Sequence, residues 1–445
     1  MKKKKTFYLE SLGCAKNTVD SESMAALLVR DGYIAVEQPA RADVLMVNTC
    51  GFIASARKES LDALKDLSAN KKDGQILIAA GCLTQRDRDL VVREVPRLDG
   101  ILGTRRWMDI LEVLSKIQQT PGRIAPIYHL PDVPTIGTDE KGIIRAAAQG
   151  TSAYLKIADG CRRPCAFCAI PLIKGSAVSR PIETILDEVV ILQNNGIQEI
   201  NLIAQDVTDY GSDLGMKDAL PHLLERIHET APGIPWIRLL YAYPGAVSDR
   251  LIQQLSDTNV ILPYLDMPLQ HAHPDMLRRM KRPAKMDWVY KTIAKLRTSN
   301  PQIALRTTFI VGYPGESELE FNTLLEFIRE VKFDHVGVFT FSFEPGTSSE
   351  PLGDPIPAEL KDERYGILMA EQESISRTIN QKFIGQNLDV LIEGTDNGIS
   401  IGRSYRDAPE IDGMVVVEGV LPIGKLSQVQ ITGAMSYDLV GRPLQ

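Results

Sequence analysis

Short apolar runs alternate with amphipathic stretches through the first part of the chain. The runs in "TFYLESLGC", "DVLMVNTC" and "QILIAAGC" are rich in aliphatic and β-branched residues, as buried strands are. Between them, "SESMAALLVRDG" and "SARKESLDALKDLSAN" carry apolar residues at helical spacing. This alternation of strand and helix predicts an N-terminal doubly wound parallel α/β domain over residues 1–125.

The pattern weakens after that domain and then returns. Residues 126–150 are rich in Pro, Gly and polar residues, which predicts an interdomain linker. From residue 151 onward, strand-like runs recur in "AYLKIA", "EINLIA", "WIRLLY", "YLDMPL", "LRTTFIVG" and "HVGVFTFS", with helical periodicity between them. We expect a central partial (β/α)6 barrel over residues 151–378, with its chemistry in the loops at the carboxyl ends of the strands.

The last part of the chain has a third pattern. The runs "LDVLIEG", "ISIGRSY" and "GMVVVEG" are short and are separated by Gly, Asn and Asp turns. They predict a small antiparallel OB-like β-barrel over residues 379–445. A helix in "PAELKDERYGILMAEQESISRTINQKF" is expected to connect it to the central barrel.

The charge of the chain narrows the classes of partner. The net charge of −7 argues against a protein that binds nucleic acid mainly through phosphates. The basic start "MKKKKTFYLE" has no apolar stretch behind it, so we interpret it as a solvated tail and not a signal peptide. No run approaches the length of a membrane span. We therefore expect a cytoplasmic protein without a membrane partner, in a compartment where thiols stay reduced.

The six cysteines fall into two groups of three. Cys14, Cys50 and Cys82, the N-terminal trio, each follow one of the early strand-like runs. Because the carboxyl ends of parallel strands meet at one edge of a sheet, these three thiols can come together in space. Three separate buried cysteines are the plainer interpretation. Disulfides would require an oxidising compartment.

The second group lies in "DGCRRPCAFCAIP", directly after the first expected barrel strand. Cys161, Cys165 and Cys168, the barrel trio, have the spacing CxxxCxxC and no fourth cysteine nearby. Structural zinc sites and ordinary iron–sulfur clusters use four ligands. Three thiolates can instead hold three irons of a 4Fe-4S cluster and leave the fourth iron open to a small molecule. A degenerate zinc site or a structural cysteine loop is the alternative.

CxxxCxxC on a predicted partial (β/α) barrel resembles the radical S-adenosylmethionine superfamily. The resemblance implies a 4Fe-4S cluster on the barrel trio, with S-adenosyl-L-methionine bound to its open iron and cleaved to a 5′-deoxyadenosyl radical. Phe167, between the last two cysteines, resembles the aromatic residue that family members place near the adenine. Simple packing of the loop would also explain it.

The order of the domains, with three cysteines before CxxxCxxC and a small terminal barrel, is similar to the radical methylthiotransferases. The stretches "LGCAKNTVDSE", "NTCGFI", "AAGCLTQR", "IADGCRRPCAFCAIP" and "FSFEPGTSS" carry this resemblance. It implies a second 4Fe-4S cluster on the N-terminal trio that holds a sulfur-bearing species, and a flavodoxin- or ferredoxin-type reductant. In that family the terminal barrel is a TRAM domain that recognises the substrate.

Within the family, "CAKNTVDSE", "NTCGFI" and especially "GRSYRDAPEIDG" resemble the RimO branch. Its members methylthiolate the β-carbon of an aspartate in the small-subunit ribosomal protein of the decoding centre. The alternatives are the MiaB branch, which modifies tRNA adenosine, and, in another class, a two-cluster iron–sulfur electron carrier. One departure is "LIKGSAVSRP", where Lys174 and Val178 stand at positions that are usually arginine in the family.

Several other residues are candidates for cofactor binding. Gln205 and Asp206 end an expected barrel strand, where capping a turn is the alternative to a ligand contact. Arg306 has the guanidinium that suits a carboxylate, and Gly312 and Gly315 allow close approach of the backbone to adenine or ribose, or a simple turn. No residue stands out as a catalytic acid or base.

"LQHAHPDMLRRMKR" combines two histidines with a basic run near another expected strand end. The basic residues can steer a substrate or form a solvated helix face.

The terminal barrel has an excess of negative charge, since residues 379–445 contain five basic and eight acidic residues. This disfavours RNA as its ligand, makes tRNA an unlikely substrate and suits a basic protein.

Overall fold

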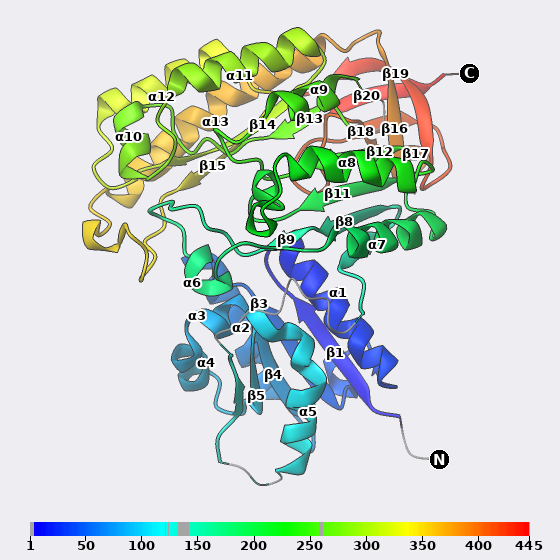
Figure 1. The fold of residues 1–445 in the computed structure, drawn as a ribbon, viewed down its shortest axis with the longest axis vertical. Helices are drawn as coiled ribbons and strands as arrows, with labels where there is room; N and C mark the ends of the chain where they lie inside the picture. Colours follow the sequence, from blue (N-terminus) through cyan, green and yellow to red (C-terminus); the bar gives the residue numbers. More distant parts are fainter. Residues whose placement is uncertain (1–3, 121, 123, 132–141, 258–260, 445) are drawn as a thin grey trace.

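The computed structural model describes residues 4–120, 122, 124–131, 142–257 and 261–444 (Figure 1). Three units follow one another along the chain. The N-terminal unit lies at one end of the molecule, the barrel occupies the middle, and the C-terminal unit lies on the far side of the barrel.

The N-terminal unit is a parallel six-stranded sheet in the order β2-β1-β3-β4-β5-β6. Its strands are β1 (Thr6–Ser11), β2 (Ile34–Ala35), β3 (Val44–Thr49), β4 (Ile76–Gly81), β5 (Gly100–Gly103) and β6 (Ile127–His129). Val44 and Met46 of β3 pack with α1 (Ala15–Arg30) and α5 (Ile110–Gln119) on one face. Leu45 and Val47 pack on the other face, with α2 (Ala54–Asn70) and α4 (Arg88–Glu94). Both faces are therefore covered, which explains the uninterrupted apolar runs and confirms the doubly wound prediction.

The central unit contains six parallel strands arranged as an open barrel. These strands are β8 (Ser152–Lys156), β11 (Glu199–Ile203), β12 (Trp236–Leu239), β13 (Tyr264–Asp266), β14 (Ala304–Val311) and β15 (His335–Thr340). A parallel bridge between Ile237 and Ile261 joins the two halves of the barrel. The outer helices are α7 (Ile182–Asn194), α8 (Ala219–Thr230), α9 (Asp249–Asp257), α11 (Met286–Ser299), α12 (Glu318–Val331) and α13 (Ala358–Gln381). The prediction of a partial (β/α)6 barrel is confirmed.

Part of the segment expected as a linker is strand. Within residues 126–150, β6 completes the N-terminal sheet, and β7 (Ala146–Gln149) pairs antiparallel with β8. Residues 132–141 lie outside the described residues. Strands this short leave no periodic signal among the prolines and glycines around them.

The C-terminal unit is a closed five-stranded barrel in the order β16-β17-β18-β20-β19. Its strands are β16 (Asn387–Asp396), β17 (Ile399–Arg403), β18 (Val415–Glu418), β19 (Leu426–Ala434) and β20 (Leu439–Pro443). All neighbours are antiparallel except β18 and β20, which are parallel. An odd number of strands cannot close with antiparallel pairs alone, so the OB-like prediction holds with this one change.

A loop of the C-terminal unit fills the amino end of the central barrel. Residues 404–414 connect β17 to β18 and correspond to most of "GRSYRDAPEIDG". The carbonyl of Tyr405 accepts a hydrogen bond from Arg238 at 2.7 Å. The Tyr264 hydroxyl, on the first residue of β13, donates to Asp412 at 2.7 Å. The C-terminal unit therefore lies at the end of the barrel opposite to the loops expected to carry the chemistry.

Candidate functional site

The N-terminal trio lies at one edge of the first sheet. Cys14 is the N-cap of α1, Cys50 directly follows β3, and Cys82 is the first residue of α3 (Cys82–Arg86). The strands β1, β3 and β4 that lead to them are adjacent and parallel, so their carboxyl ends deliver all three residues to one place. The approach is close, because a Cβ atom on Gly13 would lie 2.7 Å from Cys50 Cβ. Gly13 also has φ 97°, so this turn requires glycine.

Cys50 and Cys82 of this trio are partly buried, whereas Cys14 is exposed. Burial raises the pKa of Cys82 to about 12, and burial also raises the pKa of Cys50. The neighbouring thiols raise both pKa values further, whereas the Lys174 ammonium lowers them. Thiols that are buried together in this way become thiolates only when a strong positive charge such as a metal compensates them. The donor set therefore fits an iron–sulfur cluster.

The barrel trio lies in the loop between β9 (Ala158–Asp159) and α6 (Ile170–Lys174). The loop is held by backbone hydrogen bonds from Cys161 N–H to Gly175 O at 3.0 Å and from Cys168 N–H to Cys165 O at 3.2 Å. A second short strand, β10 (Val178–Ser179), pairs with β9 beyond the loop. Burial raises the pKa of Cys168 to about 12. All three cysteines of this trio are partly accessible and lie in one loop.

Two arginines contact the sulfurs of the barrel trio. The backbone N–H of Arg163 donates to Cys161 Sγ, and the Arg282 guanidinium donates to Cys165 Sγ, both at 3.4 Å. Both guanidinium groups also stack on Tyr243, at 4.2 and 4.3 Å from the ring centroid. Arg282 thus places positive charge beside Cys165, where it would stabilise a thiolate ligand, whereas the Arg163 guanidinium is paired with Asp206.

Two buried polar atoms beside this trio have no hydrogen-bond partner among the described residues. Gln205 donates to Asp159 at 3.1 Å, but its Oε1 atom, an acceptor, is unpaired. Arg282 Nε, a donor, is also unpaired. Buried polar groups are normally satisfied, so an acceptor and a donor beside this trio have hydrogen-bonding capacity left for a ligand that both donates and accepts. The ammonium and carboxylate of S-adenosylmethionine have this character.

Two further cofactor-binding candidates, Asp206 and Phe167, have contacts within the protein. Asp206 pairs with Arg163 at 2.6 Å and caps the turn Val207–Asp209 by accepting from Thr208 N–H. Phe167 packs against the apolar cluster that contains Tyr313 and Phe341. Asp206 thus caps this turn and Phe167 packs in this cluster, and contact of either residue with a cofactor stays a prediction.

Gly312 and Gly315 lie just beyond β14, at the carboxyl end of the barrel, with φ of 72° and 81°. The Gly312 N–H donates to Glu316 at 2.7 Å, and a Cβ atom on Gly312 would overlap the side chain of Lys361. Both glycines therefore form a tight turn. Their contact with a cofactor stays a prediction.

Arg306 was expected to bind the carboxylate of a cofactor, but its guanidinium is engaged elsewhere in the protein. Its guanidinium bonds Asp266 at 3.1 Å and Asp412, in the loop from the C-terminal unit, at 3.2 Å. It therefore points toward the filled amino end of the barrel and already has two carboxylate partners. The sequence could not show this, because the partner Asp412 lies more than a hundred residues away and reaches Arg306 only through the docking of another unit.

The two histidines of "LQHAHPDMLRRMKR" have structural partners. His271 is fully buried and lies 3.2 Å from Glu316, and His273 caps α10 (Pro274–Arg279) by accepting from Asp275 N–H. The basic run continues beyond α10 to Arg282, which contacts Cys165. This contact was not predicted, although a basic residue close to a strand end was the available signal.

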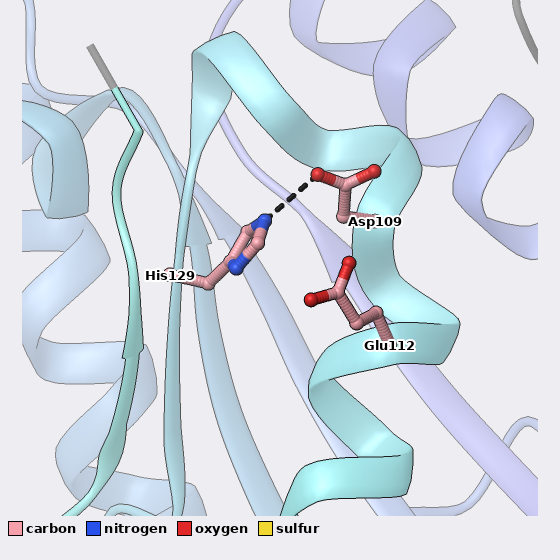
Figure 2. A group of neighbouring side chains, drawn as sticks. All are labelled: Asp109, Glu112 and His129. Carbon is pink, nitrogen blue, oxygen red and sulfur yellow. Dashed lines mark hydrogen bonds and ion pairs between the residues drawn. The ribbon is translucent and has the colours of Figure 1, made fainter.

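Another group of potential metal ligands, Asp109, Glu112 and His129, lies on the first domain (Figure 2). Figure 2 shows His129 directed at Asp109, to which its Nε2 atom lies 2.7 Å away. The Arg106 guanidinium also forms two hydrogen bonds with Asp109. Burial alone would raise the pKa of Asp109, but the bonds from Arg106 and His129 lower it. A guanidinium already neutralises the carboxylate, so we interpret the group as structural.

Comparison with known proteins first defines the class. The "Radical SAM superfamily" matches residues 155–328, "Uncharacterized protein family UPF0004" matches 6–103 and "TRAM domain" matches 384–444. The radical S-adenosylmethionine enzyme TsrM from Kitasatospora setae has a similar fold, with a TM-score of 0.57 at 12% identity over 90% of this chain and 81% of that one. Its structure is described with cobalamin and a [4Fe-4S] cluster bound. The chain thus carries a radical SAM domain between a UPF0004 domain and a TRAM domain, and it has the fold of a radical SAM enzyme.

Curated relatives define the family. The "Ribosomal protein uS12 methylthiotransferase RimO" of Chloroflexus aurantiacus is 46% identical over 98% of this chain and 99% of its own length. The protein of the same name from a Roseiflexus species is 45% identical over 99% of this chain and 97% of its own. The chain belongs to the RimO family of methylthiotransferases, which are enzymes that transfer sulfur-containing groups.

Proposed function

We propose that this protein methylthiolates the β-carbon of an aspartate in ribosomal protein uS12. The observation that carries the proposal is the pair of cysteine trios, each one ligand short of a complete cluster site, on neighbouring edges of two domains. α3, which begins at Cys82, packs against α6, which follows the barrel trio (Figure 1). An electron carrier would complete its cysteine ligation and would not need a barrel.

The residues of the chain have separate tasks in this scheme. The barrel trio would hold one 4Fe-4S cluster, and the N-terminal trio would hold the second. Gln205 Oε1 and Arg282 would bind the polar groups of S-adenosyl-L-methionine, and Phe167, Gly312 and Gly315 would line the side of its adenosine. When bound, these groups supply a carbon-centred radical on the substrate and the methylthio group that replaces the abstracted hydrogen. A flavodoxin- or ferredoxin-type protein is the electron donor that this chemistry needs.

The surface of the C-terminal unit favours a basic protein over tRNA as substrate. Arg403 and Arg406 are buried, which leaves three basic residues on its surface. Six acidic residues remain accessible: Asp389, Glu393, Asp396, Glu410, Glu418 and Asp438. An RNA-binding surface would carry an excess of basic residues.

Among the described residues no helix is long and apolar enough to cross a bilayer. We place the reaction in the cytoplasm, because ribosomes and reduced thiols are found there.

Two triple variants test the division of tasks. Replacing the barrel trio by alanine should halve the iron of the anaerobically reconstituted protein and abolish formation of 5′-deoxyadenosine. Replacing the N-terminal trio should also halve the iron but leave cofactor cleavage intact while stopping sulfur transfer. Mass spectrometry of uS12 after reaction with the wild type should show a methylthio group on an aspartate. Modification of tRNA adenosine with uS12 untouched would overturn the choice of substrate.

A further inference from the structure

The contact between the N-terminal domain and the barrel encloses four charged side chains, which we call the quartet: Asp20, Lys156, Asp159 and Lys174. None is more than 3% exposed. Lys174 lies 3.0 Å from Asp20 and 3.4 Å from Asp159, and Lys156 also bonds both carboxylates, Asp159 at 3.1 Å. Each lysine thus bridges an aspartate of the N-terminal domain and an aspartate of the barrel.

The members of the quartet belong to the elements that carry the cysteines. Asp20 lies in α1, whose N-cap is Cys14, and Asp159 ends β9, two residues before Cys161. Lys174 is the last residue of α6, which follows Cys168 and packs against the helix that begins at Cys82. A displacement of Asp20, Asp159 or Lys174 therefore moves a segment that adjoins a cysteine, and Lys156 ends β8, the strand that leads to the barrel trio. Lys174 is also the cation that lowers the pKa values of Cys50 and Cys82 from the barrel side.

Net stability does not account for the quartet. Removing four charged groups from water costs several kcal/mol for each ion, and well-packed apolar residues often replace buried ion pairs at no loss. The two ammonium groups and two carboxylates instead fix the relative position of the two domains. Apolar surfaces can shift against each other at little cost, whereas a shift in a buried ion pair leaves a charge without its partner.

We propose that the quartet sets the position of the N-terminal trio relative to the barrel trio, with Lys174 as the positioning residue. The inference rests on the proposed function, since it concerns transfer between two sites. Cleavage of S-adenosylmethionine takes place at the barrel trio alone and does not depend on this distance. Delivery of the methylthio group to the substrate carbon does depend on it, and a misplacement of about 1 Å can reduce such a step by roughly 100-fold.

Three variants of the full-length reconstituted enzyme test the proposal. Lys174→Met removes the ammonium and keeps the length of the side chain, and Lys174→Arg restores a positive charge. Lys71→Met is the control, because it removes an ammonium that pairs with Asp99 inside the N-terminal domain and, among the described residues, contacts neither a cysteine nor the C-terminal unit. For Lys174→Met we expect 5′-deoxyadenosine formation per iron to stay within about twofold, while methylthiolated uS12 per 5′-deoxyadenosine falls at least roughly tenfold. Lys174→Arg should recover most of that ratio, and Lys71→Met should keep it.

A second measurement uses the cluster-free protein and does not depend on activity. Hydrogen exchange of the backbone in α1 and α6 should be faster in Lys174→Met than in the wild type, and unchanged there in Lys71→Met. An unchanged product ratio in Lys174→Met would overturn the proposal, as would a parallel loss of both products together with iron. If the wild type makes no methylthiolated uS12, the proposed function fails, and the exchange measurement alone then decides whether Lys174 fixes the domain contact.

Discussion

At the scale of single residues, the Arg282 guanidinium lies beside a sulfur of the barrel trio. Arg282 reaches Cys165 Sγ and stacks on Tyr243, whose other partner in stacking is Arg163. Tyr243 fixes the plane of both guanidinium groups, so the charge is held in place at little further cost in side-chain entropy. Hydrogen bonds and charge near cluster sulfurs are among the factors that set the reduction potential of an iron–sulfur cluster.

Arg282→Met should therefore lower the midpoint potential of the barrel cluster. Reduction adds a negative charge that the guanidinium stabilises, and a charged hydrogen bond of about 1.5 kcal/mol corresponds to about 60 mV for one electron. The potential is measured by redox titration in protein whose N-terminal trio is alanine, so that only one cluster contributes. Arg279→Met is the matched control, since Arg279 pairs with Glu320 and not with a cysteine. Equal potentials for the two variants would contradict the prediction.

At the scale of elements, the loop between β17 and β18 joins the C-terminal unit to the central barrel. Glu199, the first residue of β11, is fully buried and pairs with Arg238 of β12 at 2.9 Å and with Arg403 of β17 at 2.6 Å. Burial alone would raise the pKa of Glu199, but the two guanidinium groups outweigh it and lower the pKa to about 2. The motif "GRSYRDAPEIDG" thus has a structural task at the amino end of the barrel.

Glu199→Gln should lower the free energy of unfolding of the cluster-free protein by about 3 kcal/mol at pH 7, because it leaves two buried guanidinium groups short of a carboxylate. The folded pKa of Glu199 lies below its ordinary value of 4.5, so its contribution is complete above pH 4.5 and is lost as the pH falls toward 2. The difference between wild type and variant in urea unfolding should shrink over that range. The control Glu326→Gln, at an exposed position of α12, should change the free energy by less than about 0.5 kcal/mol. A difference that does not vary with pH would contradict the assignment to Glu199.

At the scale of the whole molecule, the pattern of the sequence predicts more of the fold than of the site. Buried parallel strands leave long apolar runs, and the cysteines at the ends of those runs can be assigned to one sheet edge from the sequence alone. Arg306 and the quartet could not be placed, because their partners come from other domains and charged residues have no periodicity that reveals a contact between domains. Lys174 stands out in the sequence only as a departure from an arginine. Its role in the contact between the domains depends on an ion pair with Asp20, which is 154 residues away in the sequence.

The arrangement of the three units also restricts how a protein substrate can bind. The cysteine trios lie at the carboxyl end of the barrel, and the C-terminal unit is anchored at the amino end, so a substrate held by both must run along the side of the barrel. The C-terminal unit is bound to the barrel through buried polar contacts, so its binding surface is tested in the full chain and not in isolation.

The accessible acidic residues of that unit should attract uS12 by long-range electrostatics. Asp396 ends β16 and Glu418 ends β18, and both pair in register with Ile399, whose apolar side chain is exposed. The double variant Asp396→Asn and Glu418→Gln should slow association with uS12 by roughly twofold to tenfold at low salt, with a smaller effect as salt rises, because screening weakens attraction between exposed charges. Asp73→Asn with Asp89→Asn on the N-terminal domain removes the same charge from exposed positions and should leave the association rate nearly unchanged. The rates are measured by stopped-flow fluorescence with labelled uS12. If both double variants slow association equally, net charge and not the C-terminal surface directs the encounter, and uS12 recognition has to be sought on another face.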